Sequence, residues 1–412
     1  MKLSHDPGSP ADRLVSLDQF RGYTVAGMFL VNFLGDFRSV HPLLDHHNTY
    51  CSYADTIMPQ FFFAVGFAYR LTFLRARARD GLARACRHAV VRNLLLLAIG
   101  VAIYGFGSGA KTWEEVRALG LGGYLLQTCG GSLFQTLVHI GVTGLWVLPV
   151  MGAGGRTIAL FAAASGLLHL GLSGTFWYEW VTTHRAIDGG LLGFLTWTVP
   201  TLVGALAHDA VASRPGRSVA SGGTAAAGVA AGTEAATGAG GAQDAGPASG
   251  GANSAGAPAA RGPVAALLPL LVWGAALMVA GYALSCGNAV AHGGWFTEPP
   301  FVPPSRPVDL WTMSQKTGSL SYLTFGAGFS LAVYAVCVLA CDLRGLQWGV
   351  FRTLGQNALL AYLIHSPISA GVQAVVPRDA PLWAAMAGFV VFFAITWAVM
   401  RVLERSRIYL RL

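Results

Sequence analysis

The chain has 412 residues, of which 54% are hydrophobic and only 11% are charged, and its mean hydropathy is +0.53. Soluble domains carry about 25% charged residues, so this composition excludes an ordinary soluble fold. The formal net charge of +8 comes from basic residues in short segments between apolar runs, which indicates membrane topology rather than nucleic-acid binding.

The predicted fold is all-α, a polytopic transmembrane bundle of about ten helices. In chain order, the predicted helices are residues 14–35, 54–74, 90–106, 133–151, 158–172, 190–207, 264–284, 319–341, 350–364 and 381–402. The polar start of the chain has no apolar h-region, so we expect no cleavable signal peptide. Residues 111–119 mix aromatic, aliphatic and charged side chains at helical spacing, which is typical of a helix lying on the outer membrane surface.

Residues 213–262 are almost all Gly, Ala and Ser, too poor in large apolar side chains to build a core and too polar to span a bilayer. We expect a disordered cytoplasmic linker, most simply an inert spacer. It divides the chain into a membrane domain of six helices, 1–212, and a membrane domain of four helices, 263–412.

The positions of the basic residues predict the orientation. With a cytoplasmic N-terminus, the arginine cluster of residues 75–92 and the arginines of residues 344–411 all fall on the cytoplasmic side, as the positive-inside rule requires. Both termini are then cytoplasmic, which agrees with an even number of helices. The Ala-, Gly- and Arg-rich composition is typical of a high-GC bacterium, so we expect the bacterial inner membrane.

The six cysteines form no CxxC pair and no Cys/His ligand spacing, so neither a zinc site nor a disulfide framework is indicated. Four of them are most simply small apolar residues within helices. Cys51 and Cys286 fall in predicted outer loops, where a single bridge between them is compatible with an oxidising compartment.

Polar side chains inside a membrane are costly, so each is a candidate for function unless it merely joins helices. Asp18 and Arg21 lie three residues apart on one face of the first helix, where a local ion pair is the simpler interpretation. Asn32 lies nearer the outer end, where an interhelical hydrogen bond is the simpler one.

The outer loop after the first helix is unusually polar and contains His46 and His47, followed by Asp55 at the start of the second helix. The helix dipole alone would explain a carboxylate at that position. Because imidazole titrates near neutral pH and a carboxylate orients its ring, these residues also suit general-base or nucleophilic catalysis. Metal binding is disfavoured, since adjacent side chains diverge and no third ligand is suitably spaced.

The predicted helix 350–364 carries Gln356 and Asn357 near its middle, and His365 follows at its outer end. These residues would line a cavity shared with the histidine loop. For His365, capping of a helix interface is an equally good interpretation. Four prolines of residues 299–304 stiffen a large outer loop around Trp295 and Phe296, which would cover the site or bind the face of a sugar.

At these residues the chain resembles the heparan-α-glucosaminide N-acetyltransferase family, including its bacterial members. Residues 16–22 match the family's S-L-D-x-F-R-G, and 47–50 are similar to its H-x-x-W, with Tyr50 in place of Trp. Residues 54–66 match A-D-x-x-x-P-x-F-x-F-x-x-G, while 310–312 and 355–358 fit its later W-T and G-x-N-A signatures. The match leaves open which of His46 and His47 is the counterpart of the family histidine.

The resemblance implies transmembrane acetylation, in which acetyl-CoA enters from the cytoplasm and its acetyl group reaches an amino sugar or glycan on the far side. His47, aided by His46 and oriented by Asp55, would then act as general base or be transiently acylated. Asn32, Asn357 and His365 would bind the thioester or its oxyanion, and the basic residues Arg21, Arg75, Arg92 and Arg352 would meet the phosphates of the donor.

Two other functions remain open on the sequence alone. A secondary transporter or flippase-like carrier also uses about ten helices with buried polar residues, although no internal repeat and no broken helix is evident here. A catalytically inactive scaffold is the third alternative. The partners expected for the enzyme are acetyl-CoA, a sugar acceptor and the lipid bilayer, with no metal and no nucleic acid, and a homo-oligomer is compatible with the sequence.

Overall fold

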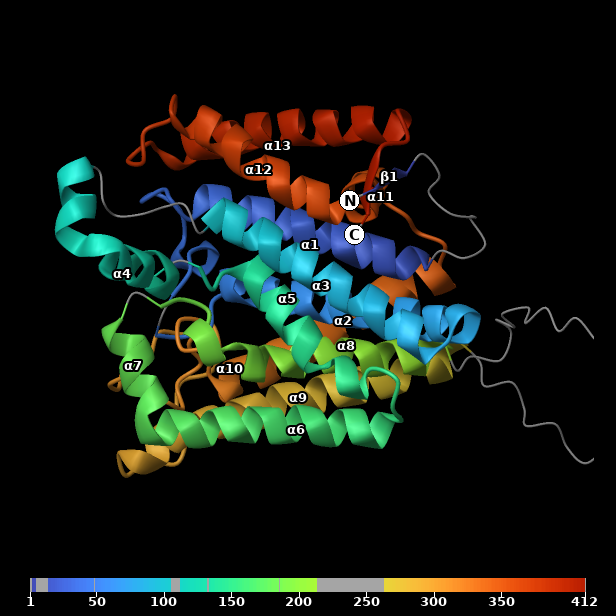
Figure 1. Ribbon diagram of the computed structural model, residues 1–412, viewed down its shortest axis with the longest axis horizontal. Coiled ribbons are helices and arrows are strands. Elements are labelled where there is room, and N and C mark those ends of the chain that lie inside the picture. The colour runs from blue at the N-terminus through green and yellow to red at the C-terminus, as the bar shows by residue number, and fades with distance from the viewer. Residues whose placement is uncertain are drawn as a thin grey trace, which may run out of the picture.

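The computed structural model describes residues 2–4, 14–47, 49–104, 112–131, 133–184, 186–212 and 263–411. Long helices run side by side along one axis, as expected for an all-α bundle (Figure 1). The helices are α1 (Val15–Leu34), α2 (Tyr53–Asp80), α3 (Leu82–Tyr104), α4 (Trp113–Gly131), α5 (Thr136–Trp146), α6 (Gly155–Leu172), α7 (Tyr178–Thr183), α8 (Phe194–Ala212), α9 (Pro263–Ala291), α10 (Leu320–Cys337), α11 (Gly349–Gln356), α12 (Ala358–Gln373) and α13 (Leu382–Arg405).

Among the described residues, seven helical segments are long and apolar enough to cross a membrane. Each of the ten predicted ranges overlaps a helix, but three of these helices are not among the seven. α1 carries Asp18, Gln19, Arg21 and Asn32, which lower its hydropathy, while α5 has 11 residues and α12 has 16. The predicted linker, 213–262, lies outside the described residues.

The helices divide into an inner and an outer set according to burial. In α2, α8 and α10, 67%, 78% and 61% of the spanning segment is buried inside the protein, against 22% in α3, α9 and α13. Helices that are apolar on all sides must bury one face on protein and the other in lipid. The inner set therefore forms the framework on which the outer helices pack.

Glycines allow the inner helices to approach each other closely. A Cβ atom added to Gly66 of α2 would lie 1.7 Å from the carbonyl oxygen of Thr201 on α8, and one added to Gly204 of α8 would lie 2.0 Å from that of Phe63. Gly22 and Gly355 make the same reciprocal contact between α1 and α11. Small residues at such crossings are a general device of membrane bundles, because packing replaces the hydrophobic effect between helices.

The predicted helix 350–364 is not continuous, and this part of the prediction was wrong. It is broken at Asn357, whose backbone (φ −131°, ψ 41°) is not helical, into α11 and α12. The side chain of Asn357 accepts a hydrogen bond from Leu410 N at 3.1 Å and donates one to Ile408 O at 3.0 Å. The break therefore holds the C-terminal segment rather than lining a cavity in mid-membrane.

Both chain termini lie beside α11, in the half of the bundle away from α4, and strands β1 (Lys2–Ser4) and β2 (Tyr409–Arg411) pair antiparallel there (Figure 1). Helices α4 and α7 lie at the opposite end. The loop that joins α1 to α2, with its 3-10 turn Pro42–Leu44, is also at the end away from the termini. The histidine loop thus lies toward the end of the bundle that is away from the two termini.

The α2–α8 crossing yields a test of the packing. Because a methyl group on Gly66 would overlap a backbone carbonyl, Gly66→Ala forces the two helices apart. We expect the free energy of unfolding to fall by about 1–3 kcal/mol or more, and the Tm measured in detergent to be lower. Gly371→Ala on α12 is the matched control, since its added Cβ meets nothing within 4 Å. A Gly66→Ala protein with the Tm of the wild type would contradict the close contact between α2 and α8.

Candidate functional site

Asp55 is fixed in the first turn of α2 by the start of the helix itself. Ser52 caps the helix, and Asp55 Oδ2 accepts hydrogen bonds from Ser52 N at 2.9 Å and Ser52 Oγ at 3.0 Å. The side chain is fully buried. Such a capping box is a common arrangement at the start of a helix. Helix capping thus explains the position of Asp55 but leaves its second oxygen, Oδ1, for another partner.

That partner is His46. Its Nδ1 lies 2.9 Å from Asp55 Oδ1 and 3.1 Å from Gln315 Oε1. Because both atoms are acceptors, Nδ1 must carry the proton, and the neutral ring then has its lone pair on Nε2. No hydrogen bond to Nε2 is found within the described ranges, and the side chain is 43% exposed.

The charge environment favours the protonated ring. Loss of water around His46 acts to lower its pKa, but the hydrogen bond to Asp55 and the charges of Asp55 and Asp188 outweigh this and raise the pKa above the ordinary 6.5. A histidine with an orienting carboxylate and an open Nε2 is the arrangement required of a general base or nucleophile at neutral pH.

His47 points elsewhere. Its Nε2 lies 2.7 Å from the carbonyl oxygen of Pro42, and its ring stacks on Tyr50 with centroids 4.4 Å apart. Only its backbone N approaches Asp55 Oδ2, at 3.5 Å. Of the two histidines named from the sequence, the structure therefore brings the ring of His46, not that of His47, onto Asp55.

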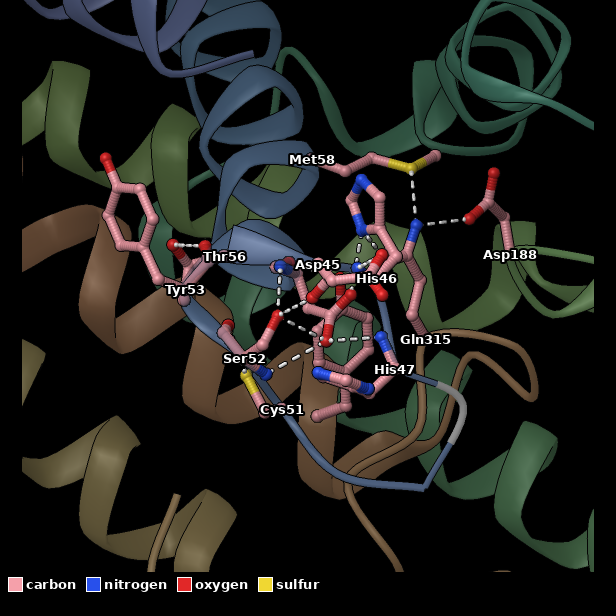
Figure 2. A network of polar contacts seen from close by, with 12 residues as sticks. Asp45, His46, His47, Cys51, Ser52, Tyr53, Thr56, Met58, Asp188 and Gln315 are labelled. Carbon is pink, nitrogen blue, oxygen red and sulfur yellow. Dashed lines mark hydrogen bonds and ion pairs between the residues drawn. The ribbon is translucent and has the colours of Figure 1, made fainter. Parts of the chain in front are cut away.

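Asp188 and Gln315 belong to the same network and were missed in the sequence. Gln315 lies between His46 and Asp188 (Figure 2), and its Nε2 donates to Asp188 Oδ1 at 2.8 Å. Asp188 is only 5% exposed. Burial raises the pKa of Asp188 to about 6, against the lowering effects of Gln315 and His46. Their sequence signals were weak: a carboxylate just before an apolar run, and a glutamine shortly after the Trp311–Thr312 pair.

Hydroxyl groups from several helices approach this network. Tyr322 of α10 donates a hydrogen bond to the backbone oxygen of Asp55 at 2.6 Å. Tyr104 of α3 and Tyr362 of α12 are hydrogen-bonded to each other, and both interact electrostatically with Asp188. The network is thus surrounded by polar atoms although it borders the apolar bundle.

Asn32 and His365 also lie together, as a second polar pair. His365 Nδ1 lies 2.5 Å from Tyr362 O, so its Nε2 is the acceptor facing Asn32 Nδ2 at 3.5 Å. The ring of His365 stacks on Phe29. Asn357, which the sequence grouped with this pair, lies eight positions before His365 and binds the C-terminal segment instead, about 12 Å away at 1.5 Å per helical residue.

The candidate donor-binding arginines fall into two kinds. Arg352 is half-exposed, with Nη2 3.6 Å from Glu404. Arg21 interacts electrostatically with Asp18 and also with Arg92, so the two guanidinium groups of like charge repel each other. Arg92 lies over the Tyr69 ring at 5.5 Å, and its Nη1 is buried with no hydrogen-bond partner in the described part of the chain. Such a pair favours a bound anion.

The proline-rich loop of residues 299–304 joins the histidine loop through a hydrogen bond from Phe301 N to Cys51 O at 2.9 Å. Between them lies a hollow of about 360 Å³, open to solvent, whose lining includes Tyr50, Asn288 and Glu298. Trp295 and Phe296 are 83% and 74% exposed. Cys51 and Cys286 are both free thiols, so the structure has no bridge between them. Within the described ranges no group of His, Cys, Asp and Glu is arranged to hold a metal ion.

No protein-family model matches the chain, and no curated protein matches it. The candidate site therefore rests on its own geometry.

The buried carboxylate of Asp188 gives a stability prediction with a definite sign. Its pKa is raised from 3.8 to about 6, so the folded state binds this proton more tightly, and stability falls as the pH rises from about 4 to above 6. Asp188→Asn removes that dependence while keeping an acceptor for Gln315. We expect the Tm of the variant relative to wild type to be higher at pH 7.5 than at pH 4.5, by the equivalent of roughly 2 kcal/mol, because about a third of the full effect is already present at pH 4.5.

The control is Asp36→Asn, because Asp36 is an exposed carboxylate that also accepts a hydrogen bond from a glutamine, Gln373, at 2.9 Å. The pH dependence of the Tm at the buried position is compared with that of this variant. A pH-independent difference for Asp188→Asn would show that folding does not raise the pKa of Asp188.

Proposed function

We propose that the protein is a membrane-embedded acyltransferase in which His46, oriented by Asp55, is the reactive base. The observation that carries this proposal is the pairing of a fully buried carboxylate with Nδ1 of a half-exposed histidine whose Nε2 is open. The donor is acetyl-CoA, and the acceptor is an amino sugar or glycan on the side of the histidine loop. The resemblance of residues 16–22 and 54–66 to the heparan-α-glucosaminide N-acetyltransferase family supports the same chemistry.

In direct transfer, the acceptor nitrogen or oxygen attacks the thioester carbonyl while its proton passes to His46 Nε2. The carbonyl–sulfur bond then breaks, and the proton on Nε2 neutralises the leaving thiolate. Asp55 stabilises the imidazolium that forms in between. In the covalent alternative, Nε2 itself attacks the thioester and the thiolate leaves. In a second step the acceptor attacks the acetyl carbonyl, the bond from the acetyl carbon to Nε2 breaks, and the acceptor's proton passes to the released Nε2 and from there to the thiolate.

Asn32 is our candidate for binding the oxyanion that develops on the carbonyl. Its amide has two N–H groups, and His365 Nε2 accepts one of them, which leaves the other to donate. His365, held by Tyr362 O, then acts as the residue that orients Asn32. Arg21 and Arg92 would bind the donor phosphates, because their mutual repulsion is relieved by an anion.

One observation supports the transporter alternative, namely the break between α11 and α12. Broken helices form the ion and substrate sites of many transporters. However, the break lies at Asn357, which is buried and whose amide already binds Ile408 and Leu410. The geometry therefore favours acyl transfer.

The proposal is tested by following thiol release from acetyl-CoA by purified protein, with glucosamine as the acceptor probe. General-base catalysis contributes about 10²–10⁴-fold, so we expect His46→Ala to lower the rate by at least about a hundredfold. His47→Ala is the matched control, because its ring contacts Pro42 and Tyr50 rather than Asp55, and it should keep most of the rate.

Label from radioactive acetyl-CoA that stays on wild-type protein without acceptor would assign the covalent route. A rate that depends on His47 and not on His46 would contradict the assignment. If glucosamine enters proteoliposomes without acetyl-CoA, and no thiol is released when acetyl-CoA is present, the protein is a transporter and not an acyltransferase.

A further inference from the structure

The orientation of the Gln315 amide is set by Asp188. An ionised carboxylate can only accept hydrogen bonds, so the NH₂ end of the amide must face Asp188 Oδ1, 2.8 Å away. The two ends of a glutamine amide have nearly the same shape, and only such partners distinguish them. The oxygen end is therefore directed to the other side, toward His46.

This orientation determines which nitrogen of His46 carries the proton. Gln315 Oε1 lies 3.1 Å from His46 Nδ1 and, like Asp55 Oδ1 at 2.9 Å, requires a proton there. If the amide were reversed, its NH₂ group would face the N–H of Nδ1, donor against donor. That arrangement would either move the ring off Asp55 or transfer the proton to Nε2, which would remove the reactive lone pair.

The two loops that carry Asp188 and Gln315 are held together independently of these side chains. Gly189 N donates to Lys316 O at 2.9 Å, and Thr196 Oγ1 donates to Gly318 O at 2.7 Å. Trp197 Nε1 donates to Asp188 O at 2.8 Å. Asp188 has a φ of +54°, in the left-handed region of backbone conformation that residues other than glycine rarely adopt. The surrounding contacts thus hold Asp188 in an unfavourable backbone conformation that directs its carboxylate at Gln315 (Figure 2).

We propose that Asp188 is a positioning residue that acts through Gln315 to keep His46 in the tautomer whose Nε2 lone pair is open to the site. This inference rests on the proposed function only in making His46 the reactive group. The charged and titratable groups around the His46 ring are Asp55 and Asp188, with Asp45 accepting a hydrogen bond from the His46 backbone. Asp188 in turn interacts electrostatically with Asp55, Tyr104, Tyr322 and Tyr362.

A chemical probe of His46 tests this without any acyl transfer. Diethyl pyrocarbonate modifies an unprotonated imidazole nitrogen, and Nδ1 is engaged with Asp55, so the reagent reports the lone pair on Nε2. The rate of modification at His46 is followed by peptide mass spectrometry as a function of pH in the full-length protein. The midpoint of this profile reports the charge around the ring, whereas the plateau at high pH reports the tautomer.

Two substitutions at one position separate charge from orientation. Asp188→Asn and Asp188→Leu both remove a negative charge near His46, so both should move the midpoint to lower pH. Only Asp188→Leu removes the acceptor for Gln315, and it should lower the plateau about fivefold. This is the factor by which one hydrogen bond of about 1 kcal/mol shifts the equilibrium between the two tautomers. Asp188→Asn should keep the plateau of the wild type.

Action through Gln315 is tested in a double-mutant cycle. In a Gln315→Leu background, adding Asp188→Leu should leave the plateau unchanged. Asp36→Leu, which breaks the comparable contact with Gln373, is the control and should match wild type in both midpoint and plateau.

A wild-type plateau in folded Asp188→Leu would overturn the proposal. It would also be overturned if Asp188→Leu lowered the plateau by the same factor in the Gln315→Leu background as in the wild type. If Asp188→Leu fails to fold, Gln315→Leu replaces it: a plateau lowered in Gln315→Leu but not in Asp188→Asn supports the proposal, and equal plateaus in both overturn it. Because acetyl-CoA is absent, these outcomes are independent of whether the protein proves to be an acyltransferase.

Discussion

The candidate site depends on one buried carboxylate at the start of a helix. Asp55 is fully buried, so its charge requires partners, and the Ser52 cap supplies two of them to Oδ2. The remaining oxygen then holds the ring of His46. The Asp55 side chain thus contributes to the start of α2 and also orients the ring of His46, so the stability of α2 and the geometry of the candidate site depend on the same residue.

The bundle supports this arrangement by rigid packing. α2 is buried against α8 through glycine contacts that bring the two backbones together, and Tyr322 of α10 binds the backbone oxygen of Asp55. Polar residues that a membrane would disfavour are therefore placed where protein surrounds them. The arginines and the termini lie toward one end and the histidine loop toward the other, which suits a donor and an acceptor that approach from opposite sides.

The sequence predicted the helical class and the meeting of a loop histidine with Asp55, because apolar runs and a carboxylate at a helix start are local signals. It did not distinguish His46 from His47, since the direction of neighbouring side chains depends on the Pro42–Leu44 turn and on the Pro42 carbonyl. Asp188 and Gln315 are 127 residues apart, so only the folded chain brings them together. Asn357 was misplaced because a helix break that binds the C-terminal segment looks, in sequence, like a polar stretch of helix.

The central claim is that a donor on the side of the chain termini acetylates an acceptor on the side of His46. The most direct measurement uses sealed vesicles of one orientation, with acetyl-CoA on the side of the termini and glucosamine on the other. The account predicts free thiol on the first side and an equal amount of N-acetylated sugar on the second, with neither in the His46→Ala protein. Acetyl-CoA that reacts only from the side of the histidine loop, or sugar that crosses without being acetylated, would contradict it.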